Sequence, residues 1–569
     1  MKMSGAQMLL EGFVREGVEV IFGILGGAVL PLYDCLPQFP QLRHILTRHE
    51  QGAAHAAEGY ARATGRVGVC FATSGPGATN LVTGIADAYM DSVPLVAVTG
   101  QVPRALIGKD AFQEIDITGI TLPITKHNYL VREAAEIPRT VREAFYLAGS
   151  GRPGPVLIDV PRDVLVEQAD YHYPQQLDLP SYKPTLKGHP TQIKKAVRLI
   201  NEAQKPVILA GRGVIISGAF KELQTLAETA QIPVITTLLG VSCFPEGHIL
   251  SYGMLGMHGM VYANLAVDAA DLIVAIGMRF DDRATGQVTA FAPHARIIHI
   301  DIDPAEIGKN VRVDVPIVGD VKTVLSDLNK QLEPKEHLAW LEELDELRRR
   351  HPSLNIRDVD AVLPQYVVRQ VYEATGGKAT IVTGVGQHQM WGAQHYRYDQ
   401  PNTLITSGGL GTMGFGLPAA VGVQVARPGS TVWLLDGDGS FQMTIQELAT
   451  VAQERLPLKI AVFNNGYLGM VRQWQDLFYG KRYVATPLAG PDFVKVAGAY
   501  GIPGTAVKRR DEIAPAIARA MASQGPFLID FHVEAEENVY PMIPQGGSLA
   551  QFLEEPKMEE TKWPQRSTR

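Results

Sequence analysis

Short apolar runs alternate with helical stretches along the whole chain, and this alternation limits the fold more than any other feature of the sequence. Pro155–Pro161, Leu272–Ile276 and Val432–Leu435 are typical runs, bounded by Gly, Asp, Arg or Pro. Their near-continuous apolar character suits strands buried on both faces of parallel sheets, with helices between them. We therefore expect an α/β chain. None of the runs approaches the roughly 20 residues that a bilayer span requires, so we expect no membrane role.

Length and composition fit several soluble globular domains. At about 150 residues per domain, the 569 residues correspond to three or four domains. A chain with 46% hydrophobic and 20% charged residues is neither disordered nor fibrous. Its net charge of −7 and its lack of a basic block argue against nucleic-acid binding. Three scattered cysteines (Cys35, Cys70 and Cys243) and an N-terminus without a signal-peptide layout favour the cytoplasm.

Changes in composition divide the chain into three α/β blocks. Gln168–Pro190 is rich in Pro, Tyr and polar residues, which predicts a linker, and the charged helical segment Glu336–Arg350 follows the second block. We expect domains at 1–167, 191–332 and 364–550, joined by 168–190 and 333–363 and followed by a tail at 551–569. Expected strands of the later blocks are Pro206–Ala210, Pro233–Thr237, Leu272–Ile276, Arg296–Ile302, Thr380–Thr383, Thr431–Leu435, Lys459–Phe463 and Phe527–Phe531. The first and third blocks are candidates for distant copies of one sheet.

Two polar turns in the third block form the strongest local signal. Gly437-Asp438-Gly439-Ser440 directly follows TVWLLD, and Asn464-Asn465-Gly466 directly follows KIAVF. Open α/β sheets bind ligands at the carboxyl ends of their strands. Glycines beside Asp438 let the backbone approach a phosphate, and Asp438 and Asn465 offer the oxygen ligands that Mg²⁺ prefers. Either turn alone is ordinary turn composition, but the pair predicts a site for Mg²⁺ and a diphosphate.

This pair of turns resembles the thiamine diphosphate motif of the thiamine-dependent decarboxylases and carboligases. The resemblance extends over about residues 4–550 and is specific to the catalytic subunits of the acetohydroxyacid (acetolactate) synthase family. It rests on RHEQGAAHAAEGYARATG from Arg48, TSGPGATN from Thr73, KDAFQEIDITG from Lys109, GMLGMHG from Gly253, RFDDRATG from Arg279, HIDIDPAEIGKN from His299, GLGTMGFGLPAA from Gly409 and GMVRQWQ from Gly469. It implies three consecutive domains, each with a mainly parallel sheet flanked by helices: a pyrimidine-binding domain, a central FAD-contacting Rossmann-like domain, and a diphosphate- and Mg²⁺-binding domain.

A carboxylate for the thiamine ring is the second requirement of such a site. Glu50 lies where the strand-like LRHILT meets the Ala- and Gly-rich QGAAHAAEGYARAT, and a carboxylate there suits the start of a helix. The resemblance identifies Glu50 as the glutamate that protonates N1′ of the pyrimidine, which makes the cofactor's amino group basic. Glu58, further along this helix, is interpreted as structural. In the family, the first domain of one subunit faces the third domain of another, which implies a homodimer or homotetramer.

The resemblance also implies cofactor and metal contacts. For thiamine diphosphate these are Glu50, Ser74, Gly75, Pro76, Asn80, Gln387, His388, Gly411, Met413, Gly437, Gly439, Ser440, Tyr467, Leu468 and Met470. For Mg²⁺ they are Asp438, Asn465 and Tyr467. Met413 corresponds to the residue that holds the cofactor in its bent shape, although a lone Met is more often core filler.

The acceptor pocket is the third part of the implied site. Arg283 corresponds to the residue that grips the carboxylate of the second 2-ketoacid; without the resemblance, a surface salt bridge with Asp281 or Asp282 is the simpler interpretation. Trp474 corresponds to the tryptophan that shapes the pocket, and Gln113 to an active-site glutamine. Further matches are Phe112, Lys109, Arg162 and, along the family's herbicide channel, Pro103 and Ala28. Leu25 stands where the family usually has Pro, which changes the rigidity of that loop.

The middle block has no clean G-x-G-x-x-G motif, and Gly211-Arg212-Gly213 is only a weak fragment. The resemblance nevertheless implies FAD contacts at Arg152, Gly211, Gly213, His258, Gly277, Arg279, Asp301, Ile302 and Asp320. Because acetolactate synthesis involves no net electron transfer, the implied FAD is structural.

The implied reaction belongs to branched-chain amino-acid biosynthesis. Pyruvate is decarboxylated on thiamine diphosphate, and the hydroxyethyl unit is coupled to pyruvate, giving 2-acetolactate, or to 2-ketobutyrate, giving 2-aceto-2-hydroxybutyrate. A small regulatory subunit is a further expected partner. An FAD-using pyruvate oxidase is the alternative, against which FDDR and MVRQWQ argue. A glyoxylate carboligase lacks the glutamate found here at position 50, and a non-catalytic relative would not keep Glu50, Asp438 and Asn465 together.

Overall fold

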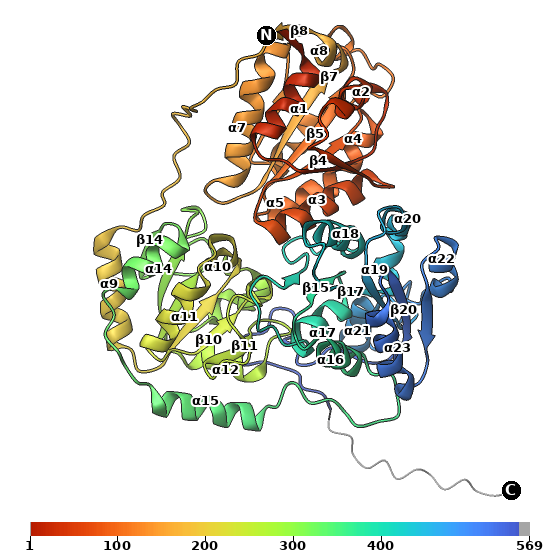
Figure 1. The fold of residues 1–569 in the computed structure, drawn as a ribbon. Helices are drawn as coiled ribbons and strands as arrows, with labels where there is room; N and C mark the ends of the chain where they lie inside the picture. The colour runs from red at the N-terminus through yellow and green to blue at the C-terminus, as the bar shows by residue number, and fades with distance from the viewer. Residues whose placement is uncertain (1, 557–569) are drawn as a thin grey trace, which may run out of the picture.

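The computed structural model describes residues 2–556 and contains three α/β domains (Figure 1). The expected fold class is confirmed, because each domain contains a six-stranded sheet in which all neighbouring strands are parallel. A separate antiparallel pair joins β1 (Lys2–Ser4) to β8 (Gln168–Asp170). Residues 557–569 of the expected tail lie outside the described residues. Within the described residues, no helix is long and apolar enough to cross a membrane.

The first sheet has the strand order β3-β2-β4-β5-β7-β6. Its strands are β2 (Val20–Gly23), β3 (Arg43–Leu46), β4 (Gly68–Ala72), β5 (Leu95–Gln101), β6 (His127–Leu130) and β7 (Pro155–Pro161). One face is covered by α1 (Gly5–Arg15), α2 (Leu30–Cys35), α7 (Ile137–Gly149) and α8 (Arg162–Val166), and the other by α3 (Glu50–Thr64) and α5 (Val82–Met90). The short helices α4 (Pro76–Asn80) and α6 (Ile117–Thr121) lie in connections.

The central sheet has the order β11-β10-β9-β12-β13-β14. Its strands are β9 (Pro206–Ala210), β10 (Val234–Thr236), β11 (Ser251–Met254), β12 (Leu272–Ile276), β13 (Arg296–Asp301) and β14 (Val315–Val318). The helices are α9 (Pro190–Glu202), α10 (Arg212–Ser217), α11 (Phe220–Thr229) and α14 (Val321–Asn329) on one face, and α12 (Val261–Ala269) and α15 (Leu338–Arg350) on the other, with α13 (Asp282–Thr285) after β12. The order reverses between β9 and β12, as in doubly wound dinucleotide-binding sheets.

The third sheet has the order β16-β15-β17-β18-β20-β19. Its strands are β15 (Thr380–Thr383), β16 (Leu404–Ile405), β17 (Val432–Gly437), β18 (Lys459–Asn464), β19 (Gly504–Val507) and β20 (Phe527–His532). The helices are α16 (Pro364–Thr375), α17 (Gln387–His395) and α23 (Ile513–Ala522) on one face, α18 (Gly416–Ala426), α20 (Leu448–Gln453) and α22 (Phe493–Ala499) on the other, and α19 (Asp438–Gln442) and α21 (Gly469–Phe478) at the strand ends. Counted within each domain, the first and third sheets have the same order, 2-1-3-4-6-5.

The first and third domains pack against each other through α3 and α18, the helices that follow the second strand of each sheet (Figure 1). A Cβ atom at Gly59 of α3 would lie 2.2 Å from the carbonyl oxygen of Ala419, and one at Gly422 of α18 would lie 1.8 Å from that of Ala56. Only glycine fits at these two crossing points, so the two glycines allow the close approach of the helices. The two domains share one apolar core there.

Two local expectations differ from the structure. The predicted linker begins with a strand, β8, which pairs with the N-terminus. Some strand bounds also shift by one or two residues: β10 is Val234–Thr236 where Pro233–Thr237 was expected, and β17 continues to Gly437. Strand β12 ends at Ile276 as expected, Gly277 follows it with a φ of +58°, and Arg283 lies in α13.

Candidate active site

The two polar turns of the third domain lie side by side. Asp438 follows the end of β17 and Asn465 follows the end of β18, and these strands are parallel neighbours with Gly437 opposite Phe463. The side chain of Asn465 shapes its own turn, because its Oδ1 accepts a hydrogen bond from the backbone N–H of Tyr467 at 3.0 Å. The structure therefore brings together the residues that the sequence analysis expected to hold a metal.

Asp438 is buried, and its Oδ2 atom has no hydrogen-bond partner among the described residues. Burial raises the pKa of this carboxyl to about 7, although backbone N–H groups of Gly439 and Gly466 act in the opposite direction. A bound divalent cation removes this desolvation cost and supplies the missing partner. The donor set of Asp438 and Asn465 oxygens thus fits Mg²⁺.

Residues expected near the diphosphate surround this turn. The methyl group of Met413 lies 3.7 Å from where a Cβ at Gly439 would be, and Leu468 lies 2.8 Å from it. The Oγ atom of Ser440 accepts a hydrogen bond from Gly414 N–H at 3.1 Å, which ties this turn to the Met413 loop. Small residues here leave room for the approach of a ligand.

Gln387 and His388 start α17 beneath the same turns. Gln387 accepts a hydrogen bond from Asn465 Nδ2 at 3.3 Å and donates to the Gln473 side chain at 2.9 Å. His388 Nε2 lies 3.4 Å from Asp436 Oδ1. Gln387 therefore positions Asn465 through a direct contact.

The first domain provides a second cluster around Glu50. Helix α3 begins at Glu50 because His49 is extended and its Nδ1 accepts the N–H of Gln51 at 3.1 Å. Glu50 Oε2 accepts a hydrogen bond from Asn80 Nδ2 at 3.0 Å, and its Oε1 lies 3.3 Å from where a Cβ at Gly77 would be. The carboxylate is thus half-buried at the Gly-rich turn that includes Ser74 and Pro76.

Gln113 joins this cluster from a distant part of the sequence. A Cβ at Gly75, which has a φ of +60°, would lie 2.9 Å from the Cα of Gln113, itself at φ +60°. Phe112 beside it is 88% exposed. Only backbone without a side chain at position 75 allows the two loops to approach this closely.

Within one chain, no hydrogen bond or ion pair between the described residues joins Glu50 to Asp438. Among the described residues, Glu50 has no hydrogen bond with the third domain. The first domain instead contacts the third through Glu447, whose Oε1 accepts hydrogen bonds from the backbone N–H groups of Arg48 at 2.9 Å and His49 at 3.0 Å. Each cluster therefore contains only some of the residues that the sequence analysis expected in the site.

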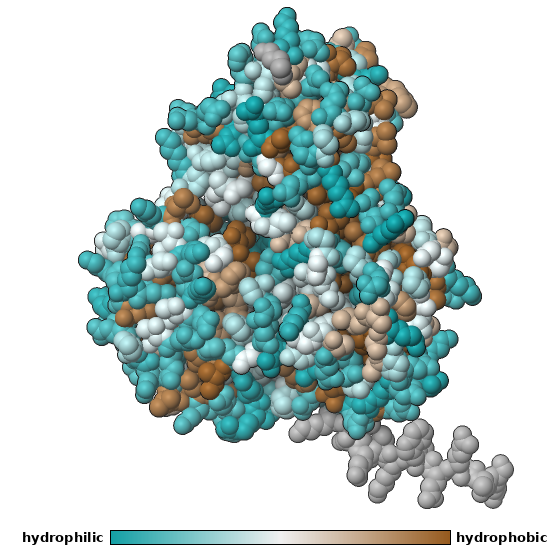
Figure 2. Space-filling model, in the orientation of Figure 1, coloured by the Kyte–Doolittle hydropathy of each residue, from teal (hydrophilic) through white to brown (hydrophobic). Residues whose placement is uncertain are grey.

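Apolar side chains are exposed on both domains that carry these clusters. Figure 2 shows hydrophobic side chains along the right-hand flank of the first domain. Exposed large hydrophobic residues include Leu25, Leu30, Leu106, Ile107, Phe112 and Leu122 in the first domain and Leu410, Met443, Val471, Tyr479 and Val484 in the third. Contiguous exposed apolar surface commonly marks a protein–protein interface.

A cavity of about 710 Å³ opens where the three domains meet. Of the residues expected to contact FAD, Arg152, Gly213, His258, Gly277, Arg279, Asp301, Ile302 and Asp320 line it. Gly211 packs instead against the backbone of Gly277, 2.3 Å from where its Cβ would be. Gly411 and Met470 of the third domain line the other end, so the cavity reaches the loops of the Asp438 cluster.

The charged residues of the cavity are mostly paired. Arg152 forms ion pairs with Asp303 at 3.2 Å and Glu306 at 2.7 Å, and Arg279 donates to the carbonyl of Met90 at 3.0 Å. Burial lowers the pKa of His258 to about 4, which keeps its ring neutral.

Arg283 and Trp474 come together in this cavity from different domains. The Arg283 guanidinium lies 5.8 Å from the centre of the Trp474 ring, within range of a cation–π contact. Arg283 is also 3.9 Å from Asp282, in a pair with both side chains more than half exposed, so that pair holds it weakly. A carboxylate that enters the cavity therefore meets an available guanidinium beside an aromatic wall.

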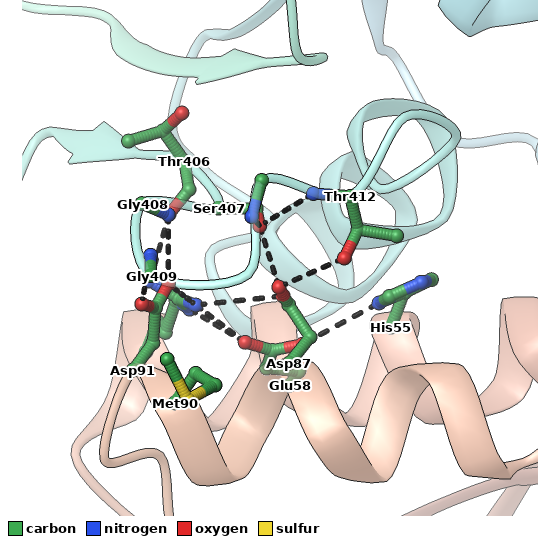
Figure 3. A network of polar contacts seen from close by, with 12 residues as sticks. His55, Glu58, Asp87, Met90, Asp91, Thr406, Ser407, Gly408, Gly409 and Thr412 are labelled. Carbon is green, nitrogen blue, oxygen red and sulfur yellow. Dashed lines mark hydrogen bonds and ion pairs between the residues drawn. The ribbon is translucent and has the colours of Figure 1, made fainter.

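A buried polar network that the sequence analysis missed connects the first and third domains (Figure 3). Arg62 of α3 contacts Glu58 and lies 2.7 Å from Asp91, and Asp91 accepts hydrogen bonds from the N–H groups of Gly408 at 2.9 Å and Gly409 at 2.6 Å. Asp87 accepts a hydrogen bond from Thr412 Oγ1 at 3.0 Å. The network fixes the loop that precedes Met413. The contacts that join the two domains pair residues more than 300 positions apart in the chain, so no local pattern reveals them.

Comparison with known proteins identifies relatives along the whole chain. Models of thiamine pyrophosphate enzymes match an N-terminal TPP binding domain at residues 3–120, a central domain at 193–328 and a C-terminal TPP binding domain at 384–531. An acetolactate synthase of Mycobacterium bovis is 53% identical over 560 residues, which cover 96% of this chain and 91% of the relative. A probable acetolactate synthase large subunit of Methanocaldococcus jannaschii is 51% identical, with 99% and 98% covered. The chloroplastic acetolactate synthase 1 of Nicotiana tabacum is 50% identical, with 97% and 85% covered.

Proposed function

The chain belongs to the acetolactate synthase family of thiamine pyrophosphate enzymes, and we propose that its active site forms where the first domain of one copy meets the third domain of another. It is a thiamine-dependent enzyme that forms acetolactate from pyruvate. The observation that carries the proposed site is the separation of the Glu50 and Asp438 clusters within one chain, together with the exposed apolar surface of both domains.

Within this site, Asp438 and the side chain of Asn465 hold Mg²⁺, together with Tyr467. The unpartnered Oδ2 of buried Asp438 supports this assignment. The Gly437–Ser440 turn binds the diphosphate, and Met413 supports the cofactor from beside Gly439. Glu50 holds a proton at N1′ of the pyrimidine. Bound thiamine diphosphate supplies an acidic ring carbon and an electron sink for decarboxylation.

Arg283 and Trp474 select and orient the acceptor. The guanidinium binds the carboxylate shared by pyruvate and 2-ketobutyrate, and the indole face contacts the side chain of the acceptor. Gln113, held against Gly75, faces the substrate from the first domain. The products are 2-acetolactate and 2-aceto-2-hydroxybutyrate, precursors of the branched-chain amino acids.

The central cavity holds FAD in a structural role. The reversal of strand order between β9 and β12, the close approach of Gly211, Gly213 and Gly277, and the arginines that line the cavity all suit a dinucleotide. The protein works as a homodimer or homotetramer in the cytoplasm. A small regulatory subunit is a further partner, because some relatives are named as large subunits.

An assay with purified protein, pyruvate, thiamine diphosphate and Mg²⁺, with and without FAD, tests the function. We expect acetolactate as the product and no hydrogen peroxide. Peroxide in place of acetolactate would identify a pyruvate oxidase and contradict the proposal.

A further inference from the structure

Where β9 passes into α10, the segment Gly211-Arg212-Gly213 carries a single side chain, that of Arg212, the first residue of the helix. Gly213 N–H donates to the carbonyl of Gly277 at 3.0 Å, and a Cβ at Gly213 would lie 2.6 Å from the Gly277 Cα. The flanking Gly211 is equally close to Gly277. Backbone packing thus forces glycine on both sides of Arg212, where the strand order of the central sheet reverses and a ligand is expected.

Arg212 differs from the other three arginines that line the cavity. Arg152, Arg279 and Arg283 each have a hydrogen bond or an ion pair. Arg212 has neither with any residue from 2 to 556, and its Nε atom is buried without a partner. Arg212 is half-buried as a whole, and a guanidinium that has lost part of its hydration without gaining a partner is costly.

The acidic residues whose charges act on Arg212 are Asp91, Glu58 and Asp87, and each already has a partner elsewhere. Glu58 and Asp91 pair with Arg62, and Asp91 also accepts the N–H groups of the Gly408–Gly409 loop (Figure 3). Burial and the positive charge of Arg62 together lower the pKa of Arg212 to about 9. Arg212 therefore lacks an anionic partner, and no described residue of the chain supplies one.

We propose that the Arg212 guanidinium binds the diphosphate of a flavin dinucleotide in the central cavity and makes the site select the dinucleotide over a flavin without a diphosphate. A guanidinium matches two phosphate oxygens with a planar pair of N–H donors. This inference rests on the proposed FAD site and goes beyond it, because it names the group that determines which flavin is retained.

Equilibrium titrations of FAD, FMN and riboflavin, followed by flavin fluorescence, test the assignment without any activity measurement. For the full-length apoprotein, Arg212→Gln is expected to weaken FAD binding roughly 10- to 100-fold, the range for a lost charged hydrogen bond, and to leave riboflavin binding within about twofold. Arg212→Lys is expected to weaken FAD binding less. Arg198→Gln, an exposed arginine of α9, is the matched control and should change neither affinity.

The outcomes separate the two levels of the proposal. If wild type binds FAD but Arg212→Gln binds FAD equally well, or loses FAD and riboflavin affinity to the same extent, the role of Arg212 is overturned while the FAD site stands. If wild type binds no FAD, the FAD site and this inference both fall. Should the Gln variant fail to fold, the Lys variant decides: equal losses for FAD and riboflavin contradict the assignment, and a loss for FAD alone supports it.

Discussion

The first and third domains have the same strand order but carry different chemistry at equivalent places. The connection from the second strand to the following helix bears Glu50 in the first domain and the Met413 loop in the third. The connection after the third strand is Gly-rich in both, yet only the third domain has an aspartate there, Asp438. Under the proposed function, one topology thus provides two different halves of a site: the fold determines where each half lies, and the loop residues determine what it binds.

The largest effect is expected at the first-domain half. Glu50→Gln removes the carboxyl group proposed to hold a proton at the pyrimidine, and the loss of one acid–base group lowers the rate about 10²- to 10⁴-fold. Acetolactate formation at saturating thiamine diphosphate measures this. Glu11→Gln, which removes a half-buried carboxylate of α1, is the control and should keep wild-type turnover. Wild-type turnover in Glu50→Gln would show that the carboxylate of the first domain has no part in the chemistry.

A different defect is expected at the third-domain half. Asp438→Asn keeps the shape of the side chain but loses the charge that binds Mg²⁺, so the concentrations of Mg²⁺ and thiamine diphosphate needed for half-maximal activity should rise at least tenfold. Cofactor titrations measure the shift, and Asp492→Asn at the start of α22 serves as the control. Overlapping titration curves for Asp438→Asn and wild type would show that Asp438 only shapes its turn and does not bind Mg²⁺.

The contact between the two domains should be sensitive to a single methyl group. Gly59→Ala places a Cβ 2.2 Å from the Ala419 carbonyl and is expected to destabilise the chain by about 1–3 kcal/mol, the range for overpacking. Gly498→Ala in α22 meets nothing within 4 Å and should be neutral or slightly stabilising. Thermal unfolding of both variants compares them. Equal melting temperatures would mean that the α3–α18 crossing is not tightly packed.

The proposed acceptor pocket lies between two domains, because Arg283 comes from the central domain and Trp474 from the third. Trp474→Leu should lower the preference for 2-ketobutyrate over pyruvate, because one methylene in an apolar pocket is worth roughly 1–3 kcal/mol at best. Arg283→Lys should weaken both reactions. The ratio of the two products formed from a mixture of the two ketoacids measures this. An unchanged ratio in Trp474→Leu would show that Trp474 does not line the acceptor pocket.

The smallest effect concerns a pair of buried aspartates on equivalent strands, Asp159 of β7 and Asp530 of β20. Burial raises the pKa of Asp159 to about 7, above its value in the unfolded chain, so the folded state binds the extra proton and loses stability as the pH rises from about 4 to 7. Asp159→Asn should remove this loss. We expect its melting temperature to gain a few degrees on wild type between pH 5 and 8.

Asp159 should show this behaviour without any response to Mg²⁺, since it contacts Thr99 and Gln101 and no expected metal ligand. A melting temperature of Asp159→Asn that follows wild type in parallel across the pH range would contradict the raised pKa.

The third-domain half was predictable from sequence because its signals are local. Asp438 and Asn465 directly follow apolar strands, and parallel strands place their carboxyl ends at one edge. The strand bounds of β9, β12 and β15 also match the prediction for the same reason.

Contacts between distant loops were not predictable in this way. The sequence around Gly75 does not indicate that Gln113 packs against it. The sequence around Arg62 does not indicate its contact with the loop that contains Gly408.

The central claim is that a complete site needs Glu50 from one copy and Asp438 from another. Co-expression of two differently tagged chains, one with Glu50→Gln and one with Asp438→Ala, followed by purification through both tags, tests it directly. Each variant alone should be inactive. In the hybrid dimer, one site carries both substitutions and the other neither, so acetolactate formation should return to about half of wild type. A hybrid as inactive as its parents would contradict the account, because each site would then lie within a single chain.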